Sequence, residues 1–163
     1  MLFRSQCETW NSQLAGGDVV RLATGPGQYW ISPQDGRKSA RCRLLWPSKP
    51  GSSREGQSPS QSLEPRPLVI ALHGAGGSEN MFFDAYGAGK IVRLCDERGW
   101  LLLAPRLSPL TGTGLDLPGL IAAVDALHPV DRRQVYVVGH SMGAMQGLNL
   151  TARHPEVVRR LAI

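Results

Sequence analysis

The sequence predicts an α/β fold in which a mostly parallel sheet is flanked by helices and preceded by an N-terminal β-hairpin. Short continuous apolar runs alternate along the chain with segments whose apolar residues recur at helical spacing. The runs end at glycine or proline, as is typical of strands that are buried on both faces of a parallel sheet. Alternation of strand and helix implies crossover connections, and therefore parallel neighbouring strands.

The bulk properties indicate one ordinary globular domain. The chain has 163 residues, of which 42% are hydrophobic and 19% are charged, which is enough for one domain with a core. Its formal net charge of +5 comes from arginines without a dense basic block, so we expect a solvated surface and no nucleic-acid partner. Examples are Arg41, Arg43, Arg93, Arg132, Arg133, Arg159 and Arg160.

Cysteine content and the N-terminal segment bear on the compartment. The three cysteines are widely spaced and form no CxxC pair, which indicates reduced, partly buried thiols and no metal site. The start, MLFRSQCETWNSQL, lacks the apolar run of a signal peptide, and no apolar stretch of about 18 residues occurs in the chain. We therefore expect a cytoplasmic protein without a membrane span.

The first elements expected are a hairpin and a loop. Residues 28–46 hold two short runs around Asp35-Gly36, a dipeptide that supplies the positive φ angles of a tight hairpin turn. Residues 47–67 are rich in Ser, Pro, Gly and Gln and have almost no apolar side chains. Such a segment cannot bury enough surface to offset its ordering entropy, so we expect a flexible loop inserted in the domain.

The remaining elements follow in regular alternation. A first central strand is expected at 68–72, and a helix at 80–98 that a left-handed Gly99 closes. A second strand follows at 100–104 and stops at Pro105. The later elements are a loop at 108–118, a helix at 120–127, a strand at 135–138, a helix at 142–153 and an apolar run at 157–163.

A candidate nucleophile lies in the pentapeptide Gly139-His140-Ser141-Met142-Gly143. A GxSxG sequence alone is weak evidence, because a chain with 19 glycines would contain one by chance about one time in ten. Here it directly follows one predicted strand and directly precedes a predicted helix, which is the context that a nucleophile elbow requires. Glycine suits both flanking positions, since helix and strand approach closely there. We therefore predict that Ser141 is a nucleophile.

Two backbone N–H groups are predicted to stabilise an oxyanion. Met142 N–H is one, because the first N–H groups of the helix point at the reacting carbonyl. The sequence His73-Gly74-Ala75-Gly76-Gly77 follows the first central strand, where an oxyanion loop belongs. We predict Ala75 N–H as the second donor, with Gly74 N–H as the alternative. Gly76 is expected to support substrate binding in the same loop.

The four histidines have structural interpretations. His73 lies at the strand end, where its ring is expected to brace the oxyanion loop by hydrogen bonding. His140 is expected to pack beside the serine. His128 and His154 each precede a proline at a helix end, where an imidazolium suits the helix dipole, so we expect surface caps.

Three other features are assigned to structure as well. Asp131 is expected to shape the turn into the following strand, and Met142 and Met145 to pack in the core, with contact between Met142 and the reacting acyl group as an alternative. Counting from Gly74, a G-x-G-x-x-G pattern would need a glycine at Glu79, and no GK[ST] follows. We therefore expect no nucleotide site.

These motifs carry a resemblance to a known family. PLVIALHGAGGSENMFFDAYG and VDRRQVYVVGHSMGAMQGLNLTARHPE resemble the α/β-hydrolase superfamily. They are similar in particular to its esterase, phospholipase/carboxylesterase and polyhydroxybutyrate depolymerase-like branch, over residues 66–163. The resemblance implies that a small-molecule or lipid carboxylic ester is hydrolysed through an acyl-enzyme on Ser141. The oxyanion would be held by backbone amides of the 74–76 loop and of Met142, and no metal or organic cofactor is implied.

The sequence departs from this family after the nucleophile. In the superfamily an acid and then a histidine follow the serine along the chain, but only 20 residues follow Gly143 and none is Asp. Glu156 and His154 lie at the end of the helix, away from the expected positions. We expect residues 1–163 to form a single domain that is truncated and crippled in catalysis. A non-catalytic binding protein of the same fold and an inactive gene fragment are the alternatives, and the oligomeric state stays open.

Overall fold

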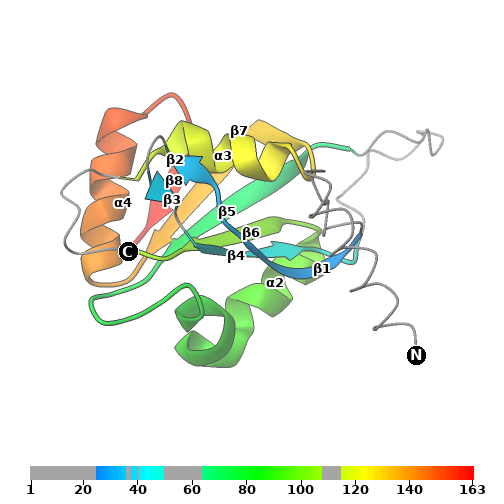
Figure 1. Cartoon of the computed structure of the whole chain (residues 1–163), viewed down its shortest axis with the longest axis horizontal. Coiled ribbons are helices and arrows are strands. Elements are labelled where there is room, and N and C mark those ends of the chain that lie inside the picture. Colours follow the sequence, from blue (N-terminus) through cyan, green and yellow to red (C-terminus); the bar gives the residue numbers. More distant parts are fainter. Residues whose placement is uncertain (1–24, 36–37, 40, 50–63, 108–114) are drawn as a thin grey trace, which may run out of the picture.

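The computed structural model describes residues 25–35, 38–39, 41–49, 64–107 and 115–163. Six strands form one sheet in the order β1-β4-β6-β5-β7-β8, and β2 and β3 form a separate ladder (Figure 1). Strands β6, β5, β7 and β8 run parallel to one another, whereas β4 pairs antiparallel with both β1 and β6. The predicted α/β fold is confirmed. The strands are β1 (Gly27–Ile31), β2 (Gln34–Asp35), β3 (Lys38–Ser39), β4 (Cys42–Trp46), β5 (Arg66–Leu72), β6 (Leu101–Pro105), β7 (Val130–Gly139) and β8 (Val158–Ala162).

The antiparallel edge of the sheet comes from the predicted hairpin. Strand β1 pairs with β4 from Gly27↔Trp46 to Ile31↔Cys42. Between them β2 pairs with β3 through Gln34↔Ser39 and Asp35↔Lys38, on either side of the predicted turn, whose residues 36 and 37 lie outside the described ranges; the separation of this pair from the main sheet was not predicted. Of the loop expected at 47–67, residues 50–63 lie outside the described ranges, and β5 begins already at Arg66.

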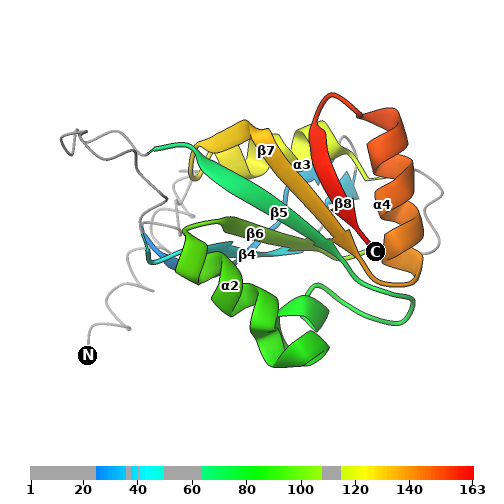
Figure 2. The same ribbon diagram turned by 180° about the vertical axis from the view of Figure 1, so that it is seen from behind.

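Helices cover both faces of the sheet. Helix α2 (Lys90–Arg98) lies on one face, and α3 (Leu117–Asp125) and α4 (Met142–Arg153) lie on the other (Figure 2). Alternation along β5 sends Leu68, Ile70 and Leu72 into the core under α3 and α4, and Val69 and Ala71 into the core under α2. Because both faces of β5 are buried, its sequence is a continuous apolar run rather than an alternating one.

The predicted helix at 80–98 is wrong over its first half. The chain there forms a π-helix, η1 (Met81–Ala85), then a 3₁₀ turn, η2 (Tyr86–Gly89), and only then α2. Gly87, Ala88 and Gly89 have φ of 57°, 49° and 69°, which an α-helix cannot accommodate. A Cβ at Gly89 would lie against the carbonyl of Phe83, so the break is also fixed by packing.

Element ends elsewhere differ less from the prediction. Gly99 closes α2 with φ 69°, and its N–H donates to Asp96 O at 3.1 Å, as predicted. Helix α3 begins before the predicted residue 120 because Pro118 fits the first helical turn, where no N–H is needed. Strand β7 begins at Val130 instead of 135. The bounds of α4 match the prediction, and the final apolar run forms β8; residues 108–114 lie outside the described part.

Arg43 corrects the expectation that the arginines are all solvated. Its side chain is only 12% exposed, and its guanidinium carbon lies 4.9 Å from the centroid of Trp30 and 4.5 Å from that of Phe83. It also pairs with Asp84 at 2.5 Å. Arg43 therefore joins the antiparallel edge of the sheet to η1 through cation–π and ionic contacts.

Two further side chains are not where the sequence placed them. His128 is 1% exposed and meets Trp46 edge-on, with ring centroids 5.1 Å apart, so it is a core residue rather than a surface cap. Burial lowers the pKa of His128, which favours the neutral ring. Met145 is 69% exposed because it lies on the outer side of α4. His154 does stand at the C-cap of α4, as predicted.

The buried thiols provide a test of the core. Cys42 and Cys95 are 0% and 3% exposed, and burial raises the pKa of both thiols to about 12. Because only the thiolate reacts, we expect iodoacetamide at pH 8 to alkylate them about a thousand-fold more slowly than an exposed cysteine. Peptide mass spectrometry after a timed pulse measures this rate, and the urea-unfolded protein is the control. Equal rates in the folded and unfolded protein would contradict it.

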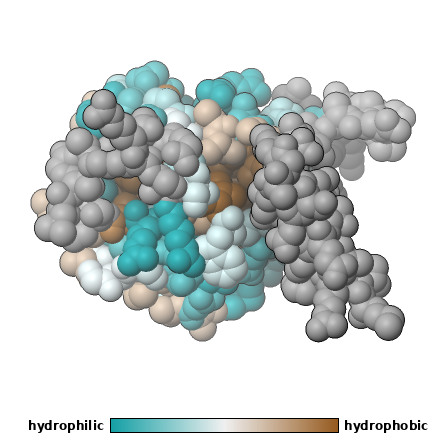
Figure 3. Space-filling view, viewed as in Figure 1, coloured by the Kyte–Doolittle hydropathy of each residue, from teal (hydrophilic) through white to brown (hydrophobic). Residues whose placement is uncertain are grey.

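The surface is mixed in character. On the face in Figure 3, strongly hydrophilic residues lie next to smaller apolar areas. Met145 and Leu148 are exposed large apolar side chains of α4. None of the helices within the described ranges combines the length and apolarity needed to cross a membrane.

Candidate active site

Ser141 occupies a strained turn between β7 and α4. Strand β7 ends at Gly139 and α4 begins at Met142. Ser141 has φ 54° and ψ −116°, although it is not glycine, and its side chain makes no capping hydrogen bond with the helix. Such a backbone costs about 1–3 kcal/mol and persists only where the surroundings enforce it. Ser141 is exposed, so its hydroxyl can meet a ligand.

Close backbone packing enforces this turn. A Cβ on Gly143 would lie against the carbonyl of Leu72 and 2.7 Å from His73 O. A Cβ on Gly139 would lie 2.5 Å from the carbonyl oxygen of Gly143. His140 N–H also donates to Leu72 O at 3.0 Å. The first turn of α4 therefore rests directly on the end of β5, which is where the glycine loop begins.

His73 braces that loop from below. It is 2% exposed, and Leu107 N–H donates to its Nε2 at 2.9 Å. Nδ1 therefore carries the proton and donates to Gly74 O, 2.7 Å away. Gly77 N–H donates to the same carbonyl at 3.1 Å. Because both ring nitrogens of His73 are engaged, this histidine orients the loop and has no nitrogen left for proton transfer.

Tyr86 links the glycine loop to the elbow, a role that the sequence did not indicate. Its hydroxyl oxygen lies 3.1 Å from His140 Nδ1 and accepts the Gly74 N–H at 3.5 Å. The Tyr86 and His140 rings are 4.8 Å apart. In the sequence Tyr86 was one apolar position of a continuous helix. The glycines at 87 and 89 were the signal that the helix breaks there and presents this side chain.

An ion pair between the buried Glu79 and the exposed Arg41 holds the far end of the glycine loop. Glu79 is 2% exposed, and its Oε1 lies 2.9 Å from Nε of Arg41, just before β4. Its other oxygen has no hydrogen-bond partner within the described residues. The pKa of Cys42 is raised mainly by burial and further by the charge of Glu79. In the sequence, Glu79 stands out only because a G-x-G-x-x-G pattern would need a glycine at its position.

The two backbone N–H groups predicted to hold an oxyanion have no acceptor among the described residues. Ala75 is exposed, and neither its N–H nor that of Met142 has an acceptor in the described part of the chain. No hydrogen bond there joins Ser141 to a histidine. His154 lies at the opposite end of α4, with Nδ1 3.8 Å from Glu156. The arrangement supplies a serine hydroxyl and N–H donors, and its contacts do not include a general base.

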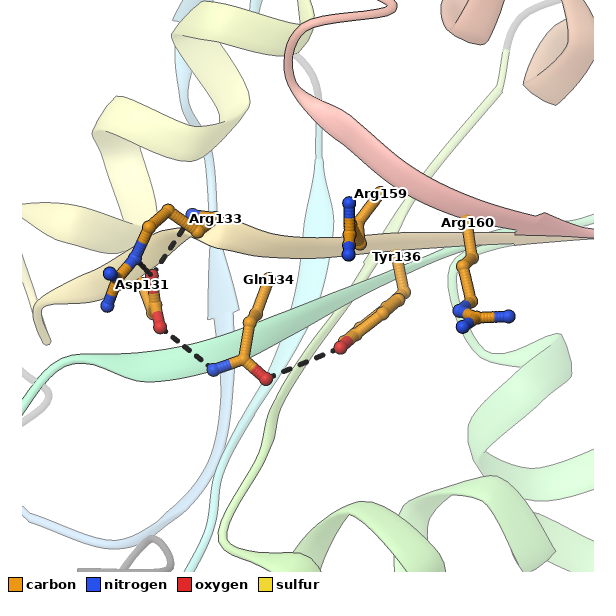
Figure 4. Close-up of a pocket in the computed structure, with 6 residues that line it drawn as sticks. All are labelled: Asp131, Arg133, Gln134, Tyr136, Arg159 and Arg160. Atoms are coloured by element: carbon orange, nitrogen blue, oxygen red, sulfur yellow. Dashed lines mark hydrogen bonds and ion pairs between the residues drawn. The ribbon is translucent and has the colours of Figure 1, made fainter.

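A hollow elsewhere on the surface has a different composition. It has a volume of about 630 Å³ and lies beside β7 and β8 (Figure 4). Its lining is polar and includes three arginines: Asp131, Arg133, Gln134, Tyr136, Arg159 and Arg160. Asp131 accepts the backbone N–H of Arg133 at 3.0 Å, consistent with its expected turn-shaping role. Among the described residues, no three His, Cys, Asp or Glu side chains are grouped to hold a metal.

Comparisons with known proteins agree with this architecture. Residues 113–163 match the family model described as "alpha/beta hydrolase fold". Feruloyl esterase B of Thermothelomyces thermophilus is 26% identical over 113 residues, which are 60% of this chain and 38% of that protein. Among solved structures, a fluorophosphonate-binding serine hydrolase of Staphylococcus aureus aligns with a TM-score of 0.63 at 13% identity, over 84% of this chain and 56% of that one.

A feruloyl esterase module from Clostridium thermocellum, complexed with sinapinate, aligns with a TM-score of 0.63 at 11% identity, over 83% of this chain and 52% of that chain. This chain thus spans 38% of the curated relative and little more than half of these structures. The sheet of this chain has parallel strands β6, β5, β7 and β8 and an antiparallel N-terminal edge. The strand order and these similarities show that the chain has the α/β-hydrolase fold.

Proposed function

We propose that this chain carries the nucleophile and oxyanion-binding half of a serine hydrolase that cleaves carboxylic esters through an acyl-enzyme on Ser141. The observation that supports it most is the strained backbone of Ser141, at φ 54° and ψ −116°, between a strand and a helix. A serine without a capping or structural hydrogen bond has no fold-related reason to occupy such a conformation. The similarity to feruloyl esterase B supports an ester as the substrate class.

The oxyanion would be held by Met142 N–H and Ala75 N–H. Gly74 N–H is the alternative second donor, but it already donates to Tyr86, whereas Ala75 N–H has no acceptor within the described residues. This favours Ala75. Gly76, with φ 72°, would allow the loop to turn so that the Ala75 amide faces the acyl group, and His73 would hold the loop in place.

Labelling with a fluorophosphonate probe tests this proposal. The probe phosphonylates the hydroxyl of an activated serine, so the intact mass of the protein should increase by one adduct, and peptide mapping should place the adduct on Ser141. Ser141→Ala should give no adduct, and circular dichroism should show that it remains folded. Hydrolysis of p-nitrophenyl acetate above the Ser141→Ala background is the second readout.

One outcome would favour a different function. Full turnover requires a general base, and loss of the base in comparable triads costs about a million-fold in rate. A stably folded protein with no adduct on Ser141 would contradict the hydrolase proposal. It would favour a non-catalytic binding protein, for which the absence of a histidine bonded to Ser141 in the described residues is the supporting observation.

Tyr86→Phe is expected to slow labelling of Ser141 by about three- to ten-fold. The substitution keeps the ring but removes the oxygen between Gly74 N–H and His140 Nδ1, and a hydrogen bond of this kind contributes about 1 kcal/mol. The loop and the elbow would then be positioned independently. The labelling rate at several probe concentrations measures the effect.

Tyr29→Phe is the matched control. It removes a hydroxyl that bonds Gly25 O at 2.6 Å, at the other edge of the sheet. This variant should lose comparable stability and keep the wild-type labelling rate. An equal decrease in both variants would show that the Tyr86 effect is one of general stability.

A further inference from the structure

We infer that the hollow beside β7 and β8 binds the phosphate group of a small molecule, at a site separate from Ser141. The hollow is lined by Asp131, Arg133, Gln134 and Tyr136 of β7 and by Arg159 and Arg160 of β8. Ser141 follows the other end of β7. Three residues of strand at about 3.3 Å each, or roughly 10 Å, separate Tyr136 from Gly139, and Ser141 lies in the turn beyond it. A ligand in the hollow would therefore not occupy the ester site.

An irregularity in β8 brings two arginines to this hollow. Val135 pairs with Val158, but the next residue of β7, Tyr136, pairs with Arg160. Arg159 is therefore an extra residue, as in a β-bulge, a feature that redirects a side chain at a sheet edge. Regular alternation would send Arg159 and Arg160 to opposite faces, whereas here both line one hollow. Figure 4 shows Gln134, Tyr136 and Arg160 extending to the same side of β7.

The floor of the hollow is a fixed polar network. Tyr136 O–H donates to Gln134 at 3.4 Å, and Gln134 donates to Asp131 at 2.8 Å. The Tyr136 ring stacks on Trp100, with centroids 5.1 Å apart and planes 14° apart. Arg133 pairs with Asp131 at 3.3 Å and so compensates its charge. The floor is held in place before any ligand arrives, which reduces the entropy lost on binding.

The two guanidinium groups of β8 remain uncompensated. Within the described residues, neither Arg159 nor Arg160 forms an ion pair or donates a side-chain hydrogen bond. A guanidinium has a rigid fork of donors that matches phosphate oxygens two at a time. The volume of about 630 Å³ exceeds that of one phosphate ion and is typical of sites for small organic ligands. The ligand class that fits is a phosphorylated small molecule.

Titration with inorganic pyrophosphate and with phenyl phosphate tests the site, by isothermal calorimetry at constant ionic strength. We expect saturable binding of both, and we expect Arg160→Gln to weaken it by about ten-fold. Arg159→Gln should weaken binding similarly, and it replaces Arg160→Gln as the test if that variant folds poorly. Backbone amide shifts in the NMR spectrum should change at Gln134, Tyr136 and Arg160, and not at Ser141.

Arg153→Gln is the matched control, because it removes the same charge from the last turn of α4, outside the hollow. It should leave the affinity unchanged. Equal weakening by Arg153→Gln and Arg160→Gln would mean general electrostatic attraction and would overturn the site. Absence of saturable binding to the wild-type protein would overturn it too, and so would binding to phosphatidic acid vesicles without binding to phenyl phosphate.

Discussion

Replacing Gly143 with alanine is expected to lower the free energy of unfolding by about 3 kcal/mol or more. The added Cβ would overlap the carbonyl of Leu72 and lie 2.7 Å from His73 O. Both obstacles are backbone atoms at the end of the central strand, so no side-chain rotation can relieve them. Helix α4 would have to move away from β5, and the turn that presents Ser141 would move with it.

Gly147→Ala provides the control in the same helix. Its Cβ would meet Leu161 Cδ1 at 2.8 Å and Val137 Cγ1 at 3.3 Å, both ends of side chains that can shift. Alanine also favours a helix over glycine by about 1 kcal/mol. We therefore expect Gly147→Ala to change the free energy of unfolding, measured by urea denaturation, by less than about 1 kcal/mol. Equal stability of the two variants would contradict the close packing of α4 against β5 at Gly143.

The parts of the fold that the sequence predicted well are those governed by local chemistry. A run such as 68–72 must be a strand with both faces buried, and Pro155 limits α4 from the C-terminal side. The turn at Ser141 was recognisable for the same reason, because a helix that begins as close to its strand as α4 does requires glycines at 139 and 143.

The parts that were missed depend on contacts between distant segments. The helix at 80–98 has the apolar spacing of a continuous helix, but the glycines at 87 and 89 allow a break, and the packing of Gly89 against Phe83 fixes it. His128 precedes a proline at a helix end, which suggests a surface position, but Trp46 of β4 covers it. Tyr86 contacts His140, 54 residues away in the sequence, so the glycines at 87 and 89 signal the break in the helix but not this partner.

Ser141→Gly is expected to stabilise the protein while it abolishes labelling. The strain at φ 54° and ψ −116° costs about 1–3 kcal/mol for a residue with a Cβ, and glycine removes it. Glycine also loses about 0.5–1 kcal/mol through the entropy of the unfolded chain. We therefore expect the free energy of unfolding to rise by about 1 kcal/mol. Urea denaturation of the wild type and the variant, compared at constant m-value, measures the change.

Ser141→Ala distinguishes the effect of backbone strain on stability from the effect of the hydroxyl group. Alanine keeps the Cβ and therefore the strain, and the hydroxyl makes no capping hydrogen bond that could be lost, so this variant should match the wild type within about 0.5 kcal/mol. If Ser141→Gly were no more stable than Ser141→Ala, the strained conformation would be contradicted. If Ser141 were retained for the stability of the fold, both variants would be less stable than the wild-type protein. Stability that rises in the glycine variant as reactivity disappears indicates a residue retained for its chemistry at the expense of the fold.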